Sequence, residues 1–272
     1  MCDVCVMNKV KDRMLSRRDL FKASAGLAAA TTVGVATGTA AMADGHGSVR
    51  DMTHAYDGNF PTFFDKPGIT SELVFNFAEH GVNLFDLTIR EHTGTHVDAP
   101  LHFSADGKSV DEIAVGDLVV PLCVVDIREK AAADADTQLT PEDLNAWIAE
   151  HGDIPDRACV AMNSGWASKV ATDKFVGRDA EGKMHFPGFH PEATEMLLEM
   201  TSASSIAVDT LSLDRGLSED FATHYAWLPA GRYGIENLAG LDDVPAAGAT
   251  LVVGAPKHIG GTGGPSRIFA MV

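Results

Sequence analysis

The sequence has few cysteines, few basic side chains and no long run of large apolar residues. Four cysteines occur among its 272 residues, and Cys123 and Cys159 each lie in an apolar stretch, which favours two buried free thiols over a disulfide. Lysine and arginine total 21 against 38 aspartates and glutamates, for a net charge of −17. A surface this acidic disfavours nucleic acid and anionic membranes as partners.

The first 43 residues have the pattern of a twin-arginine export signal. Arg17 and Arg18 precede an alanine-rich run that ends in a small-x-small cleavage pattern at Ala43. This run has few large apolar side chains, which disfavours a stable membrane anchor. We therefore expect recognition by the twin-arginine export machinery, cleavage of residues 1–43 and a periplasmic protein.

Cleavage after Ala43 leaves residues 44–272, a length that fits one large domain or two small ones, and no linker divides it. The removed segment contains six basic and three acidic side chains, so the net charge of the remainder becomes −20. Cys2 and Cys5 form a C-x-x-C pair that could mark a redox or zinc site, but they would be removed with the signal.

Three histidines and an aspartate lie within eleven positions, at His92, His96, Asp98 and His102. Neutral imidazoles and carboxylates are ligands that suit zinc, manganese or ferrous iron, and a catalytic site takes about three of them. A single histidine is more often a satisfied polar residue, and Asp98 before Ala-Pro could shape a turn. The density of the cluster favours a metal site with His92, His96 and Asp98 as ligands.

The segment before this cluster indicates how the ligands are placed. Residues 83–90 are rich in β-branched and aromatic side chains, which predicts a strand, so the cluster begins near a strand end. Gly94 allows a tight backbone path between the first two histidines. His96 and Asp98, two positions apart, project to the same side if the backbone there is extended.

Strand candidates outnumber helix candidates over the rest of the chain. The expected strands cover residues 48–53, 73–77, 83–90, 121–127, 158–163, 205–209 and 250–254. One helix is expected to begin at Thr140-Pro141, where a capping threonine, a first-turn proline and acidic residues precede apolar positions. A second is expected to begin at His190-Pro191 and to run to about residue 200.

Two other motifs offer no competing chemistry. The segment 163–166, Asn-Ser-Gly-Trp, lacks the leading glycine of a G-x-S-x-G nucleophile elbow. The segment 260–264, Gly-Gly-Thr-Gly-Gly, lacks the lysine and hydroxyl residue that end a phosphate-binding loop. We expect this glycine-rich segment to form a turn that lines or caps the metal site.

The metal cluster is part of a longer pattern. Residues 92–103 read His-Thr-Gly-Thr-His-Val-Asp-Ala-Pro-Leu-His-Phe, which resembles the signature of the cyclase family of metal-dependent hydrolases, a family that includes bacterial kynurenine formamidases and isatin hydrolases. The resemblance covers essentially the whole chain after the predicted export signal. It continues in the segments 51–54, 163–166, 186–191, 208–214, 234–238 and 260–267.

The resemblance implies a fold and a complete metal site. The implied fold is a single α/β domain with a mixed central sheet or partly closed barrel flanked by helices, a swivelling β/β/α arrangement, assembled as a homodimer or homotetramer. The segment Glu236-Asn237-Leu238 matches the family residue for residue, and where two ions bind, Asp98 would be shared. The implied ligands of one or two zinc or manganese ions are His92, His96, Asp98, His224 and Glu236.

The chemistry expected of this site is hydrolysis of an amide. Water activated by the metal would attack the carbonyl carbon. His102, four residues after Asp98, would exchange protons near neutral pH and protonate the leaving nitrogen. Trp166 and Phe60 are the candidates for an aromatic pocket that binds a flat ring, with core packing as their alternative use.

The expected substrate is a small amide, either an isatin-like lactam or an N-formyl aryl amine. The family's kynurenine formamidases act in the cytoplasm, so the export signal favours a lactam or a cyclic imide. Two other functions stay open, a metal-dependent lyase that acts next to a carbonyl and a non-catalytic periplasmic protein that binds a metal or a ligand. A histidine that moves protons beside the ligands favours an enzyme.

Overall fold

The computed structural model describes residues 48–64 and 66–272. The predicted export signal, with Cys2 and Cys5, lies outside the described residues. Two compact units are present, the segment Ser71–Thr88 and a larger unit formed by the chain on either side of it. None of the helices in this part of the chain combines the length and apolarity that a membrane span requires.

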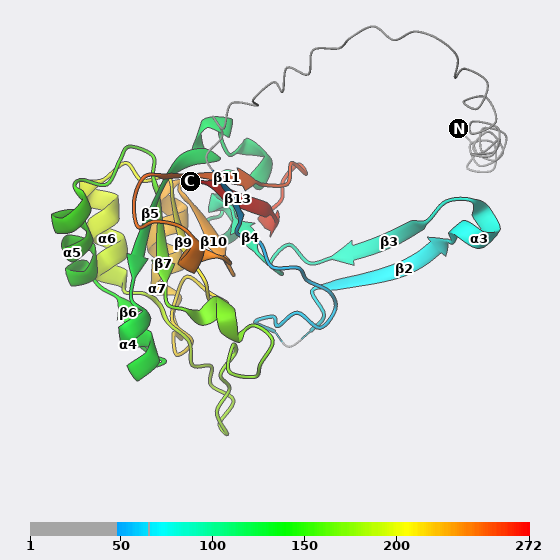
Figure 1. Ribbon diagram of the computed structural model, residues 1–272, viewed down its shortest axis with the longest axis horizontal. Helices are drawn as coiled ribbons and strands as arrows, with labels where there is room; N and C mark the ends of the chain where they lie inside the picture. Colours follow the sequence, from blue (N-terminus) through cyan, green and yellow to red (C-terminus); the bar gives the residue numbers. More distant parts are fainter. Residues whose placement is uncertain (1–47, 65) are drawn as a thin grey trace, which may run out of the picture. The chain divides into compact units, whose positions relative to one another are not determined.

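A mixed sheet of nine strands forms the centre of the larger unit (Figure 1). In spatial order the strands are β1 (Val49–Asp51), β13 (Arg267–Met271), β11 (Ala249–Gly254), β5 (Val119–Asp126), β7 (Cys159–Asn163), β9 (Ser205–Val208), β10 (Tyr233–Glu236), β4 (His96–Asp98) and β12 (Gly263–Pro265). The four central strands β5, β7, β9 and β10 are parallel to one another. Antiparallel strands continue the sheet on both sides. The expected mixed α/β fold is confirmed.

The central strands are apolar on both faces, as expected for parallel strands covered on two sides. In β5, Val120, Leu122 and Val124 contact one core cluster, whereas Cys123 and Val125 contact a second. This alternation follows from the two-residue period of a strand. Each face of the sheet therefore has its own apolar core. Cys123 and Cys159 are buried free thiols, as expected.

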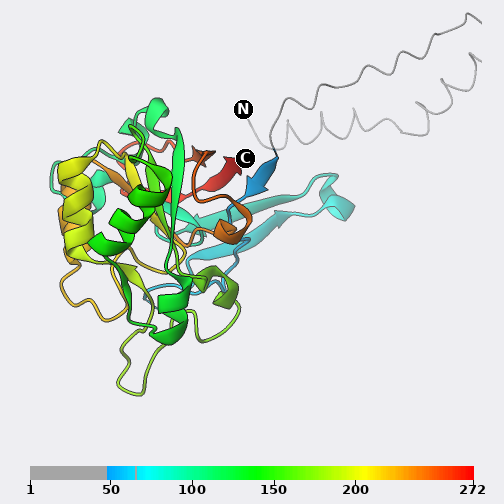
Figure 2. The ribbon, with the colours of Figure 1, turned by 60° about the vertical axis from the view of Figure 1, so that its left-hand side comes forward.

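Helices α5 (Pro141–His151) and α6 (Pro191–Met200) lie side by side (Figure 2). Together with α7 (Ala222–Trp227) they contribute to the second core. Their apolar side chains Leu144, Leu197 and Trp227 are buried against the strands. The remaining regular elements of the larger unit are short: α4 (Arg128–Ala133), the two-stranded pair β6 (Gln138–Leu139) and β8 (Gly188–Phe189), and several 3₁₀ turns. One of these turns, η1 (Pro100–Phe103), follows β4 directly.

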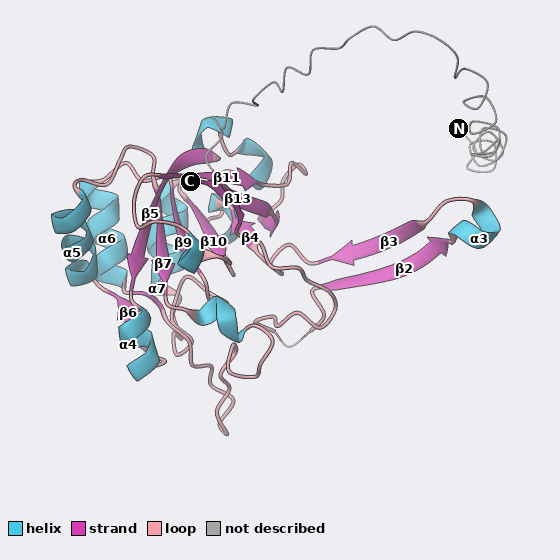
Figure 3. Cartoon of the chain, in the orientation of Figure 1, coloured by secondary structure: helices cyan, strands magenta, loops and turns pink. Residues whose placement is uncertain are grey.

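The second unit is a hairpin of β2 (Ile69–Phe75) and β3 (Leu84–Ile89) with the one-turn helix α3 (Phe77–His80) at its tip (Figure 3). Asn76 caps α3, because its side chain accepts a hydrogen bond from the backbone N–H of Glu79. Both strands leave most of their side chains exposed.

Six of the seven expected strands are confirmed. Those expected over 48–53, 83–90, 121–127, 158–163, 205–209 and 250–254 are β1, β3, β5, β7, β9 and β11. The strand expected over 73–77 is misplaced, because β2 begins at Ile69 and Asn76 already caps the next helix. Both expected helices form, α5 behind a capping box of Thr140 and Asp143 and α6 behind His190.

Candidate metal centre

The short strand β4 carries His96 and Asp98, and both side chains are buried. As predicted, the two-residue spacing in an extended segment brings them to the same side, where His96 Nε2 lies 3.3 Å from Asp98 Oδ1. β10 pairs antiparallel with β4 so that Glu236 lies directly opposite His96. Residues directly opposite in such a pair have neighbouring side chains, and Glu236 Oε2 lies 3.3 Å from His96 Nε2.

His92 and His224 approach this pair from other elements. His92 lies in the loop after β3, and its Nδ1 is 2.7 Å from Asp98 Oδ1. His224 lies on α7, with its Nε2 at 3.2 Å from Glu236 Oε1 and 3.6 Å from Asp98 Oδ2. All five residues that the family resemblance implied as ligands therefore meet at one place.

Two of the imidazoles have one nitrogen committed to an outward hydrogen bond. His96 Nδ1 is 3.0 Å from the carbonyl oxygen of Gly94, and His224 Nδ1 is 2.6 Å from Asp214 Oδ2. Both partners are acceptors only, so each Nδ1 carries a proton. When these two rings are neutral, the Nε2 atom of each therefore has a lone pair, which is directed at the carboxylates of Asp98 and Glu236.

A lone pair that faces a carboxylate oxygen needs a cation or a proton between them. His96 Nε2 and Asp98 Oδ2 are buried and make no hydrogen bond, although buried polar atoms are nearly always satisfied. Imidazole nitrogens and carboxylate oxygens are a donor set that suits a divalent transition metal. The residues present therefore fit a metal ion.

The donor atoms form two groups of three. One group is His92, His96 and Asp98, the other is Asp98, His224 and Glu236, and within each group the ligand atoms lie within 4.8 Å of one another. Asp98 belongs to both, with Oδ1 facing the first pair of histidines and Oδ2 facing His224. This geometry can accommodate one ion or two.

The electrostatics of the cluster favour positive charge. Burial alone would lower the pKa of His96, but Asp98 and Glu236 raise it to about 10. Burial would likewise raise the pKa of Asp98, yet the positive charge of a protonated His96 and the close approach of the other imidazoles hold this pKa well below its ordinary value. A divalent cation would supply the charge that these buried carboxylates attract.

His102 lies in η1 beside the donor atoms. Its ring stacks on that of His92 with centroids 3.8 Å apart, and its centroid lies 6.1 Å from that of His224. Burial lowers the pKa of His102 to about 4, although Asp98 opposes this shift. The imidazole is therefore neutral near pH 7, which makes it a proton acceptor before it can be a donor.

Aromatic side chains flank the cluster on the side of His102 and His224. The ring of Phe103 lies 4.5 Å from that of His224, and Phe221 lies 5.9 Å from it. Phe221 has a φ of 51°, which is unusual for a bulky residue and marks a position that the surrounding structure imposes. Sequence reasoning did not single out either phenylalanine.

The two aromatic residues proposed for substrate binding make none of the ring contacts with the cluster histidines that Phe103 and Phe221 make. Trp166 is 2% exposed, and its indole N–H donates to the carbonyl of Phe175 at 2.9 Å. Phe60 is 8% exposed and lines a cavity of about 360 Å³ with Tyr56. Their role in substrate binding stays a prediction.

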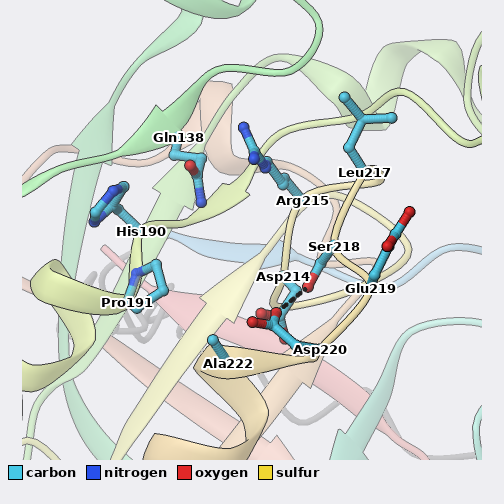
Figure 4. A pocket seen from close by; sticks show the side chains of 10 residues that line it. All are labelled: Gln138, His190, Pro191, Asp214, Arg215, Leu217, Ser218, Glu219, Asp220 and Ala222. Atoms are coloured by element: carbon cyan, nitrogen blue, oxygen red, sulfur yellow. Dashed lines mark hydrogen bonds between the residues drawn. The ribbon is translucent and has the colours of Figure 1, made fainter.

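A cavity of about 560 Å³ reaches Asp214, the carboxylate that bonds to His224 (Figure 4). Asp214 accepts hydrogen bonds from the backbone N–H groups of Thr223 and His224 as well as from the imidazole. It is an outer partner of the metal cluster that sequence reasoning did not identify. Its place in the family-like segment 208–214 was the only available signal.

Comparisons with known proteins identify the family of this chain. The Cyclase family model matches residues 50–215. Isatin hydrolase of Roseibium aggregatum is 34% identical over 196 residues, covering 68% of this chain and 73% of the relative. Kynurenine formamidase of Salinibacter ruber is 30% identical over 192 residues, covering 71% of this chain and 81% of the relative.

Solved structures give the same result. Isatin hydrolase A from Labrenzia aggregata, bound to benzyl benzoate, superposes with a TM-score of 0.79 at 32% identity, covering 93% of this chain and 99% of that one. An isatin hydrolase bound to the product analogue thioisatinate has a TM-score of 0.78 at 30% identity, covering 84% and 93%. The sequence match and the shared fold together establish that this chain belongs to the cyclase family of metal-dependent hydrolases.

Proposed function

We propose that this amide hydrolase opens a small, flat cyclic amide, an isatin-like lactam, by adding one water across its C–N bond. The observation that carries the proposal is the convergence of five donor residues with a neutral histidine and aromatic rings around them. The similarity to isatin hydrolases supports the lactam class. We propose zinc or manganese as the ion, in one or two copies, held by His92, His96, Asp98, His224 and Glu236.

The metal ion and the residues around its ligands would have separate roles in the reaction. A bound divalent ion would supply Lewis acidity, which lowers the pKa of water and polarises a carbonyl. His102, neutral near pH 7, would accept a proton from the attacking water and deliver it to the nitrogen as the C–N bond breaks. Phe103 and Phe221, both partly exposed, would contact the flat face of the substrate.

One alternative substrate has its own support. The similarity to a kynurenine formamidase favours an N-formyl aryl amine, which would use the same proton transfers. Its products would be an amine and a small acid, whereas a lactam gives a single ring-opened product. The two reactions are therefore separated by the products alone.

The test is a screen of the purified protein, loaded with Zn²⁺ or Mn²⁺, against isatin, cyclic imides and N-formyl aromatic amines, with product masses recorded. We expect one product from isatin or a related lactam that is heavier by one water, and loss of this activity after chelation. Release of a small acid from the formamides, with the lactams untouched, would replace the lactam proposal by the formamide one. Elimination without water uptake would indicate a lyase, and no turnover of any of these amides would contradict the lactam proposal.

A further inference from the structure

A chain of hydrogen bonds runs outward from His92 through Thr262 to Glu91. His92 Nε2 lies 3.0 Å from Thr262 Oγ1, and Thr262 Oγ1 lies 2.5 Å from Glu91 Oε2. Glu91 Oε1 also accepts from the backbone N–H of Thr262 at 3.1 Å and contacts His258 at 2.7 Å. These groups lie next to the metal cluster, and Thr262 is 170 residues away from His92 along the chain.

The direction of these hydrogen bonds is fixed by the groups that make them. An ionised carboxylate can only accept, so the single hydroxyl proton of Thr262 points at Glu91. The Thr262 oxygen is then an acceptor toward His92. His92 therefore carries a proton on Nε2, and in the neutral ring its Nδ1 has a lone pair, 2.7 Å from Asp98 Oδ1.

We infer that Thr262 and Glu91 are positioning residues that select the tautomer of His92 and present its Nδ1 to the metal ion. The inference rests on the proposed function, because it assumes that His92 is a ligand. Thr262 would thus accept an outward hydrogen bond from His92. Gly94 accepts such a bond from His96, and Asp214 accepts one from His224. Such outer partners orient ligating histidines, and losing one weakens metal binding by about 10- to 100-fold.

The glycines around Thr262 are required for this close approach. A Cβ on Gly263 would lie 2.2 Å from the carbonyl oxygen of Val97 and 2.9 Å from Cε1 of His92. A Cβ on Gly261 would lie 2.8 Å from Glu91 Oε1. The glycine-rich segment therefore lies against the cluster, as the sequence predicted, and the hydroxyl that it carries is its polar contact with His92.

The substitution Glu91→Gln reverses the direction of the hydrogen bonds made by the Thr262 hydroxyl, without changing the size of the side chain at position 91. The backbone N–H of Thr262 can only donate, so the amide oxygen must occupy the place of Oε1. The amide NH₂ group then faces the Thr262 hydroxyl and donates to it. The hydroxyl loses its acceptor and turns its proton toward His92, which favours the wrong tautomer for binding through Nδ1.

The experiment measures the dissociation constant of Zn²⁺ or Mn²⁺ by competition with a chelator, in the full chain and in four variants. Glu91→Gln and Thr262→Val should each weaken metal binding by about 10- to 100-fold. Thr262→Ser keeps the hydroxyl and should bind like the natural chain. Glu195→Gln changes an exposed carboxylate on α6 and serves as the matched control.

Unchanged metal affinity in both Glu91→Gln and Thr262→Val would overturn the inference. Equal losses of affinity in Thr262→Ser and Thr262→Val would also overturn it, because a change in packing would then explain the effect. Circular dichroism of the metal-free proteins monitors folding, and if Thr262→Val fails to fold, Glu91→Gln decides. A natural chain that binds no metal overturns the proposed function as well. A natural chain that binds metal, with variants that bind equally, overturns only the role of Thr262 and Glu91.

Discussion

At the scale of single residues, three histidines are each anchored by a different kind of acceptor. His92 has a threonine hydroxyl, His96 a backbone carbonyl and His224 a carboxylate. A carboxylate partner makes an imidazole a stronger ligand than a neutral partner does. The two groups of donors around Asp98 are therefore chemically unequal.

His102 is the residue whose loss should separate catalysis from metal binding. We predict that His102→Gln lowers kcat by about 10²- to 10⁴-fold, the usual contribution of a positioned acid and base. Its ring stacks on His92 but is not among the groups of ligand atoms, so the metal content should be unchanged. Steady-state kinetics with metal analysis of the same sample checks this, and retained turnover would rule out the role.

The sequence predicted the inner residues of the cluster better than its outer ones. The spacing of His96 and Asp98 was sufficient to predict that they share one side of an extended segment. The approach of Glu236 depends on the pairing of β10 with β4, two strands of four and three residues that show no readable periodicity. Only the family resemblance pointed to His224 and Glu236, because long-range pairing leaves no local signal.

At the scale of elements, β12 depends on the absence of side chains. It pairs antiparallel with β4, so that Gly263 lies opposite Asp98 and Gly264 lies opposite Val97. The sequence predicted a turn over residues 260–264. A turn is present at residues 259–260, but the segment ends in a strand at the edge of the sheet. Neither glycine has a side chain that could show the alternation typical of a strand, which explains why the strand was missed.

The substitution Gly263→Ala tests this close packing. The added Cβ would lie 2.2 Å from a backbone oxygen of β4, so β12 must move, and overpacking of this kind costs about 1–3 kcal/mol of unfolding free energy. Chemical denaturation measures the change. Gly260→Asn is the control, because a Cβ there meets no atom within 4 Å and asparagine tolerates the left-handed φ of 75°. Equal stability of the two variants would contradict the account.

The elements that the sequence predicted well are those with strong local signals. Helices α5 and α6 have capping residues and a proline in their first turn, and β5 and β7 are continuous apolar runs. Helix α7 was missed, since its six residues follow Phe221, which has a left-handed conformation and provides no side-chain cap. Burial of Trp227 and His224, rather than intrinsic propensity, accounts for its presence.

At the scale of the whole molecule, the hairpin of β2 and β3 exposes an unusual amount of apolar surface. Leu73, Phe77, Leu84, Phe85 and Leu87 are between 46% and 57% exposed. A two-stranded sheet alone is marginally stable in water, and contiguous exposed apolar side chains mark interaction surfaces. We propose that a second copy of the chain covers this hairpin, in keeping with the expected homo-oligomer.

The oligomer proposal predicts that charges on the hairpin dissociate the assembly. We expect the double substitution Phe85→Glu and Leu87→Glu to convert a dimer or tetramer into a monomer in analytical ultracentrifugation. Ile259→Glu alters a side chain that is 92% exposed outside the hairpin and should leave the assembly intact. A natural chain that sediments as a monomer, or a hairpin variant that stays oligomeric, would contradict the proposal.

The predicted export signal and periplasmic location concern residues outside the described part of the chain and remain predictions. The negative charge of the remaining sequence is consistent with a small-molecule substrate rather than nucleic acid. Among the described ion pairs, no lysine or arginine pairs with Asp98 or Glu236, so the charge of these buried carboxylates is balanced by the neighbouring imidazoles or by a bound cation.

The most direct test of the central claim is the amount of metal bound per chain in Asp98→Asn. Asp98 belongs to both groups of donors, so its loss should remove one carboxylate from every metal position at nearly constant size. Elemental analysis after dialysis against Zn²⁺ or Mn²⁺ should find one or two ions per natural chain and none in Asp98→Asn, with Asp86→Asn in the exposed hairpin as control. An Asp98→Asn protein that retains as much metal as the natural chain would contradict the account.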